Sequence, residues 1–210
     1  MKHLRTIVFL SALAAAVTGC NAGNPPPKES EGDYVSQIQM DRAAKDESFR
    51  KQPNDPVPPS KVAEFVPLKY FPIDPTYVVP AALKPATERI IIDMLTSQGK
   101  LRKHQRVGTL EFTLKNQPLT LPAFVEAGAG LDRLFVPFSD MTNGTETYNA
   151  GRYLELDRMP SGVYTIDFNK AYNPYCAYSH GYQCPVPPQE NDLPIQILAG
   201  EKSYTGKVRE

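Results

Sequence analysis

The 210-residue chain is poor in histidine and cysteine, with three of each, and its formal net charge is zero. A chain without a basic surplus gives no footprint for binding nucleic acid. Because His3 lies in the leader segment described below, only His104 and His180 could serve a catalytic triad or a multi-histidine metal site. The chain also lacks the G-x-S-x-G, H-E-x-x-H, phosphate-loop and dinucleotide-binding patterns. The sequence therefore carries no standard catalytic signature and predicts no cofactor.

No apolar stretch is long enough to span a membrane, which takes about 20 residues. The longest stretch, residues 7–17, follows two basic residues and has the length of a secretion-signal core. It leads into V-T-G-C, residues 17–20, which resembles a bacterial lipobox with a lipid-bearing Cys20. The alternative is an ordinary secretory signal followed by a chance cysteine. We expect residues 1–19 to be removed as a lipoprotein signal peptide.

Lipid on Cys20 would anchor the mature chain to a membrane. Each buried methylene contributes about 0.8 kcal/mol, so two or three acyl chains hold a protein stably. Asn21 follows the cysteine, where Asp would retain a lipoprotein of enteric bacteria at the inner membrane. We therefore expect a cell-envelope protein at the outer membrane, facing the periplasm, rather than at the inner membrane. The expected partners are that membrane and an unknown small ligand or envelope protein, without nucleic acid.

Hydrophobic residues make up 41% of the chain, which is enough for one domain core. Residues 20–32 are rich in proline and small polar residues and predict a flexible tether. Residues 33–210 are expected to form a single mostly-β domain, beginning with a helix over residues 33–52 that Asp33 caps. Residues 53–80 carry a proline every few positions, so they predict a belt draped over the body, without a central strand.

The predicted helix has one narrow apolar face. Val35, Ile38 and Phe49 lie on that face, and Arg42 and Lys45 interrupt it. Such a stripe predicts a surface helix that packs on the body along a single line.

From residue 88 onward, apolar residues alternate with a period of two, which is typical of strands. Leu110, Phe112 and Leu114 precede the turn K-N-Q-P, and Leu119 and Leu121 follow it, which predicts a β-hairpin. The predicted fold class is mostly β, an antiparallel sandwich or partly closed barrel with one N-terminal helix. Further strands are predicted at residues 90–94, 133–138, 151–156 and 162–168, with a last pair at 194–200 and 202–208.

Three segments are unusually polar for the ends of strands. They contain the motifs F-x-D-x-T-x-G-x-x-T-Y-x-x-G-R-Y, D-F-N-x-A-Y-N-P-x-C, C-P-x-P-P-x-x-N and A-G-E, in that order, between residues 138 and 201. In these motifs the chain resembles the bacterial domain-of-unknown-function family 1684, over about residues 40–207. The resemblance implies no activity and gives no residue a role.

The polar residues of these motifs are candidate ligand-binding residues if neighbouring strand ends converge. An arginine flanked by carboxylates can bind a carboxylate or phosphate, which predicts a binding pocket at one end of the β-domain. Two carboxylates can also act as acid and base, so the alternative is a hydrolase or lyase. Equally, Arg152 can pair with an aspartate as a structural clamp while the amides satisfy loop backbone. The candidates are Asp140, Thr142, Thr147, Tyr148, Arg152, Asp167, Asn169, Asn173, Asn191 and Glu201, of which Asp140, Asp167 or Glu201 with Arg152 would serve the hydrolase or lyase.

Cys176, His180 and Cys184 are spaced by four and four, so on a helix they would share one face and could bind zinc. Proline and glycine in the segment argue against a regular helix. In an exported chain with Cys20 taken by lipid, the two remaining cysteines predict a Cys176–Cys184 disulfide, which would contribute about 2 to 3 kcal/mol. A metal or redox site is the weaker alternative. The resemblance implies that family members without an export signal also carry this pair, where a reducing cytoplasm disfavours a disulfide.

Overall fold

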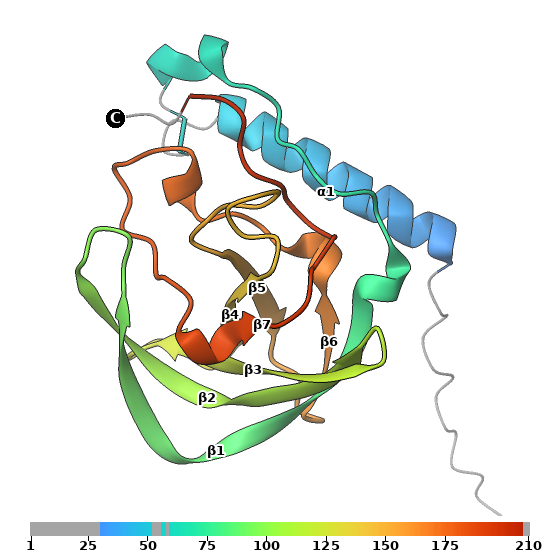
Figure 1. The fold of residues 1–210 in the computed structure, drawn as a ribbon, viewed down its shortest axis with the longest axis vertical. Helices are drawn as coiled ribbons and strands as arrows, with labels where there is room; N and C mark the ends of the chain where they lie inside the picture. Colours follow the sequence, from blue (N-terminus) through green and yellow to red (C-terminus); the bar gives the residue numbers. More distant parts are fainter. Residues whose placement is uncertain (1–29, 52–55, 58, 208–210) are drawn as a thin grey trace, which may run out of the picture.

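The computed structural model describes residues 30–51, 56–57 and 59–207. The leader at 1–19, Cys20 and nearly all of the predicted tether therefore lie outside the described residues. Among the described residues no helix is long and apolar enough to cross a membrane. The elements are α1 (Glu31–Lys51), β1 (Val78–Leu95), β2 (Leu101–Leu114), β3 (Gln117–Glu126), β4 (Arg133–Asp140), β5 (Arg152–Asp157), β6 (Val163–Asp167) and β7 (Asp192–Leu193), with short 3-10 turns between them (Figure 1).

The strands form one curled sheet in the order β5-β4-β3-β2-β1-β6, and all neighbours on this path are antiparallel. The first and last strands, β5 and β6, come into contact, so the sheet is a nearly closed barrel. The short β7 pairs in parallel with β4. The main core fills the barrel with alternating side chains such as Leu110, Leu121, Val136 and Ile166, all fully buried. The predicted fold class is confirmed.

The hairpin between β2 and β3 forms where the sequence predicts it. Lys115 and Asn116 both have positive φ, 50° and 64°, as a two-residue turn with the twist of the flanking strands requires. Leu114 pairs with Gln117 directly across this turn. Further along, the register between β2 and β3 shifts directly before Gly108, where a Cβ would lie 2.4 Å from the Lys84 carbonyl oxygen of β1. Only glycine allows this approach of the two backbones.

Strand β1 begins earlier than predicted, at Val78, inside the region expected to hold no central strand, and it lies between β2 and β6. Pro80 pairs with Thr165 of β6 and has no partner on the β2 side, because the pairing of β1 with β2 begins only at Ala81. A proline is therefore tolerated at this position. Pro85 is tolerated because the register between β1 and β2 shifts directly after it. The prediction failed because a proline that loses no ladder hydrogen bond leaves a strand intact.

The last predicted strand pair, at 194–200 and 202–208, is wrong within the described residues. The chain there makes a single bridge, between Glu201 and Tyr70. The carbonyls of Ile197, Ala199 and Glu201, which a strand would offer to a neighbour, accept instead from the guanidinium of Arg152.

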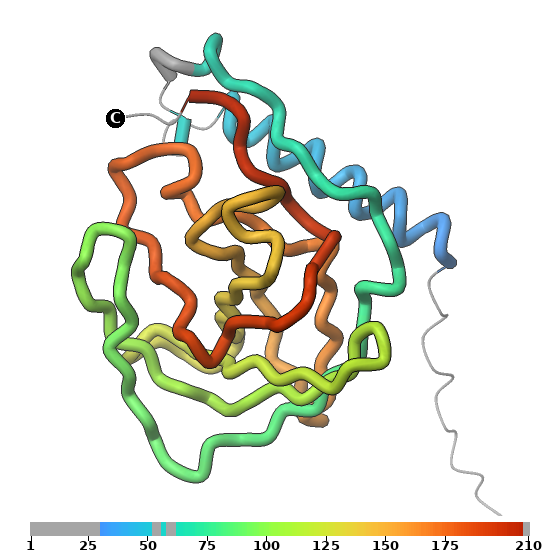
Figure 2. Tube along the Cα trace, viewed as in Figure 1, coloured from blue at the N-terminus to red at the C-terminus, as the bar shows by residue number. Residues whose placement is uncertain are grey.

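Helix α1 runs along one side of the barrel end, and residues 59–77 return along it before β1 begins (Figure 2). It begins two residues earlier than predicted, because Ser30 rather than Asp33 is the capping residue. The Ser30 hydroxyl accepts from the backbone N–H of Asp33 and donates to its carboxylate. Of the helix, only Ile38 and Phe49 are buried, which confirms a single narrow stripe.

Candidate functional site

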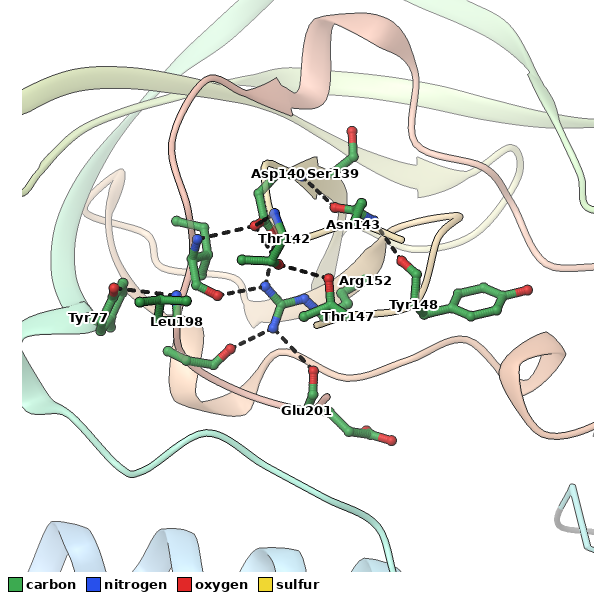
Figure 3. A network of polar contacts seen from close by, with 12 residues as sticks. Tyr77, Ser139, Asp140, Thr142, Asn143, Thr147, Tyr148, Arg152, Leu198 and Glu201 are labelled. Atoms are coloured by element: carbon green, nitrogen blue, oxygen red, sulfur yellow. Dashed lines mark hydrogen bonds and ion pairs between the residues drawn. The ribbon is translucent and has the colours of Figure 1, made fainter. Parts of the chain in front are cut away.

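Arg152, the first residue of β5, is completely buried at the centre of a polar network (Figure 3). Its Nη2 donates to Asp140 Oδ2 at 2.8 Å and to the Ile197 carbonyl at 3.0 Å. Its Nη1 donates to the carbonyls of Ala199 and Glu201, at 2.5 and 3.2 Å. Burial lowers the pKa of Arg152, and the charge of Asp140 opposes that shift. The guanidinium therefore ties the segment before Glu201 to the end of the barrel.

The Asp140 carboxylate is occupied at both oxygens. Its Oδ1 accepts from the Thr142 hydroxyl at 2.7 Å, the Thr142 N–H at 2.9 Å and the Ile197 N–H at 3.1 Å. The hydroxyls of Thr142 and Thr147 lie 2.8 Å apart. Thus Asp140, Thr142, Thr147 and Arg152 do come together, but in the closed interior, where their partners are protein groups.

The other candidates lie in separate places. Asp167 accepts from the Tyr34 hydroxyl of α1, at 3.0 Å to each oxygen, and caps the turn at Asn169. Asn191 is buried and donates to two proline carbonyls, which joins β3 to β4. Tyr148 is half-buried, its ring points away from Arg152, and burial raises its pKa.

A second ion-pair network forms around the side chain of Glu201, which is fully buried and points away from Arg152 (Figure 3). Its Oε1 accepts from Asn173 Nδ2 at 3.0 Å and from the Tyr178 hydroxyl. Its Oε2 accepts from Lys45 Nζ of α1 at 2.7 Å and from the Asn173 N–H at 3.2 Å. Burial and the nearby Glu201 charge raise the pKa of Tyr178, so its hydroxyl stays a donor.

The chain reaches this position through Gly200, whose φ is 77°. A Cβ at Gly200 would lie 2.6 Å from the Phe168 carbonyl oxygen and 2.7 Å from that of Ala171. The A-G-E motif therefore places the Glu201 backbone against Arg152 and its side chain toward α1.

A cavity of about 180 Å³ lies beside Glu201, between α1 and the barrel end. Arg42 of α1 lines it. Its Nη1 donates to the Phe71 carbonyl at 3.0 Å and its Nη2 to the Asn169 carbonyl at 3.3 Å. Its guanidinium carbon lies 4.4 Å from the centroid of the Tyr70 ring. Among the described residues Arg42 makes no ion pair. At the wall of this cavity, the buried Arg42 Nε and Tyr70 hydroxyl oxygen have no hydrogen-bond partner. Burial lowers the pKa of Arg42 and raises that of Tyr70. The lining residues are Ile38, Asp41, Arg42, Lys45, Tyr70, Asn169, Lys170, Ala171, Tyr172 and Glu201.

Of the predicted candidates, only Asn169 and Glu201 line this cavity. Sequence reasoning missed the residues that face them from α1. The signal was present, because Arg42 and Lys45 interrupt the apolar face that packs on the body. A cation on the packing face of a helix needs a partner below it.

Cys176 and Cys184 are joined by a disulfide, as predicted, with Cα atoms 6.1 Å apart. The loop packs on the turn between β1 and β2, where the Ser97 N–H donates to the Cys184 carbonyl and the Cys184 N–H to the Ser97 hydroxyl. His180 is exposed. Within the described residues, no three His, Cys, Asp or Glu side chains are grouped as metal ligands.

The fold and these networks define a small antiparallel β-barrel whose polar end is closed by internal ion pairs and one helix. The chain belongs to the family described as "Protein of unknown function (DUF1684)", whose model matches residues 63–202. It is similar to an uncharacterised protein of Haloarcula marismortui, solved in solution by NMR, with 38% identity, a TM-score of 0.64, and coverage of 81% of this chain and 95% of that one. No curated protein matches. The predicted family is confirmed, and α1 lies outside the matched region.

Proposed function

We propose that this protein is a lipid-anchored cell-envelope protein that binds a small carboxylate in the cavity between α1 and the barrel. The observation that carries the proposal is the pair of buried donors, Arg42 Nε and the Tyr70 hydroxyl, that have no partner at the cavity wall. A buried donor without an acceptor costs about 1–3 kcal/mol, so an acceptor inside the cavity would recover this loss.

The cavity wall carries three cations, Arg42, Lys45 and Lys170, against the two carboxylates Asp41 and Glu201, which favours an anion over a neutral acceptor. Lys45 is neutralised by Glu201, whereas the nearest partners of the Arg42 guanidinium are two backbone carbonyls and the Tyr70 ring. A carboxylate beside Arg42 would therefore complete an ion pair in a partly desolvated place. The volume of 180 Å³ equals about six waters at 30 Å³ each, which suits a carboxylate with a short chain.

Binding is favoured over the hydrolase or lyase alternative by the state of the carboxylates. Asp140 and Glu201 each use both oxygens within the protein, and Asp167 is held by Tyr34 in a different place. A general acid or base needs a free position toward the substrate. None of the three offers one at the cavity beside Arg42.

The anchor is supported by the lipobox-like residues 17–20 and tested separately. Cys20→Ser should move the protein out of the membrane fraction and abolish labelling by fatty acid in cells. Retention of label or of membrane association in that variant would contradict the anchor without touching the binding proposal.

The binding test is an NMR titration of the full-length protein in detergent with acetate, propionate, butyrate and succinate. We expect saturable shifts at Tyr70 and Arg42 for at least one of them. Tyr70→Phe removes a hydroxyl that has no protein partner, so it should fold normally and weaken binding about 10-fold, the effect of one lost hydrogen bond to a charged group. Arg50→Met on the same helix is the matched control, because Arg50 is exposed and lies outside the cavity lining. If none of the four acids causes shifts, or if the affinity is the same in Tyr70→Phe, the binding proposal is wrong and the cavity holds only water.

A further inference from the structure

The ammonium group of Lys45 lies in a box of aromatic rings closed by a carboxylate. Its Nζ is 2.7 Å from Glu201 Oε2 and lies 5.1, 5.5 and 5.8 Å from the ring centroids of Tyr172, Phe49 and Tyr178. Rings within about 6 Å of a cation attract it through their quadrupoles, and cages of such rings recognise ammonium ligands such as choline and methyl-lysine. The box therefore has the chemistry of an ammonium site.

The anionic wall of this box is built without α1. Asn173 and Tyr178 hold the Glu201 carboxylate, donating through Asn173 Nδ2, the Asn173 N–H and the Tyr178 hydroxyl. All of these residues and Tyr172 lie within the family-matched residues 63–202. The occupant, Lys45, comes from the helix outside that region. The receptor half and the occupant half are thus separate parts of the chain.

The occupant also lies on the solvent side of the site. The Lys45 side chain is 23% exposed, whereas that of Glu201 is 1% exposed. Helix α1 buries only Ile38 and Phe49, and Arg42, Lys45 and Asp46 join it to the body through hydrogen bonds. An ammonium group arriving from solvent would therefore meet Lys45 first and could replace it without entering the barrel core.

We propose that Glu201, Tyr172 and Tyr178 form a binding site for a primary alkylammonium group, and that Lys45 occupies this site as an intramolecular ligand. The site shares Lys45, Tyr172 and Glu201 with the lining of the carboxylate cavity, but it is argued from other contacts and stands even if that cavity holds only water. The ligand class is a small alkylamine, whose N–H groups donate to Glu201 while its carbon chain packs on the tyrosine rings. If the Lys45–Glu201 pair were only electrostatic, any small cation would stabilise a variant without Lys45 equally well, whatever its shape or hydrogen-bond donors.

The test is chemical rescue of Lys45→Ala in the full-length protein. Removing the lysine leaves the buried Glu201 charge without its cation, so the Tm should fall. Ethylammonium chloride should raise it again saturably, recovering at least half of the loss. Sodium chloride and tetramethylammonium chloride at equal ionic strength should not, because neither cation can donate N–H groups to Glu201.

Two further variants make the result decisive. Lys45→Ala with Glu201→Gln should lose the response to ethylammonium, and Lys51→Ala, which breaks the exposed ion pair with Glu47 on the same helix, should show neither the loss nor the rescue. Equal shifts with all three salts, or the same ethylammonium response in the Glu201→Gln background, would overturn the proposal. If Lys45→Ala does not fold, Lys45→Met replaces it, because methionine keeps the apolar stem of the lysine. The same salts and the same Glu201→Gln background then test the proposal.

Discussion

The Asp140–Arg152 and Lys45–Glu201 pairs meet at residue 201, which accepts from Arg152 through its carbonyl and from Lys45 through its carboxylate. In the first pair both side chains are completely inaccessible and both belong to adjacent strands of the family-matched barrel. In the second pair the cation comes from α1 and is partly exposed. Two equally buried carboxylates thus have different cations, one a fully buried arginine of the sheet and the other a partly exposed lysine of a helix.

Removing the cation of the inner pair should have the largest effect. Arg152→Met loses four hydrogen bonds and leaves the Asp140 charge buried, so we expect the free energy of unfolding to fall by about 3–5 kcal/mol. Urea denaturation of the full-length protein measures it. Arg133→Met is the control, because that arginine pairs with Glu155 and Asp157 in solvent and should contribute little. A loss for Arg152→Met no larger than that for Lys45→Met would remove the distinction between the pairs.

The Cys176–Cys184 disulfide sharpens the comparison, because its loop carries Tyr178, which donates to Glu201. Cys176→Ala with Cys184→Ala should lower the free energy of unfolding by about 2–3 kcal/mol for a separation of eight residues. The loosening should be local as well. We expect amide hydrogen exchange to accelerate in α1 and to stay slow at the Thr142 N–H, which donates to Asp140. Equal acceleration at both sites would show that the two networks do not open separately.

The parts of this architecture that were predicted from sequence depend on local patterns. The period of two along β2 and β3, the turn at Lys115 and Asn116, and the stripe of α1 all arise from neighbours in the chain. The start of β1 was missed because the effect of Pro80 depends on where the ladder with β2 begins. That is a property of the sheet, which local residues do not reveal.

The sequence identified the polar residues that form the buried networks, but it predicted only part of how they are arranged in space. Asp140 and Arg152 lie on adjacent strands, and their pairing as a clamp was one of the predicted possibilities. Glu201 lies 156 residues from Lys45, so its partner depends on how α1 crosses the closed barrel. The convergence of all ten candidates in one pocket was expected from neighbouring strand ends. Curling of the sheet instead distributes them between the interior, the helix contact and the β3–β4 junction.

Tyr34 should give the smallest effect and report on the helix contact alone. Its hydroxyl donates to Asp167, so Tyr34→Phe should lower the free energy of unfolding by at most about 1 kcal/mol at pH 7. Burial and then the Asp167 charge raise the pKa of Tyr34 above its ordinary value of 10.0. The folded protein therefore binds this proton more tightly than the unfolded chain, and the contribution is complete below pH 10 and is lost as the pH rises above it. Urea denaturation between pH 7 and 11 should show the curves of the wild type and Tyr34→Phe converging above pH 10, because the phenylalanine has no proton to lose. If the difference in the free energy of unfolding between the two proteins stays constant across that range, Tyr34 holds α1 by packing and not through its hydrogen bonds to Asp167.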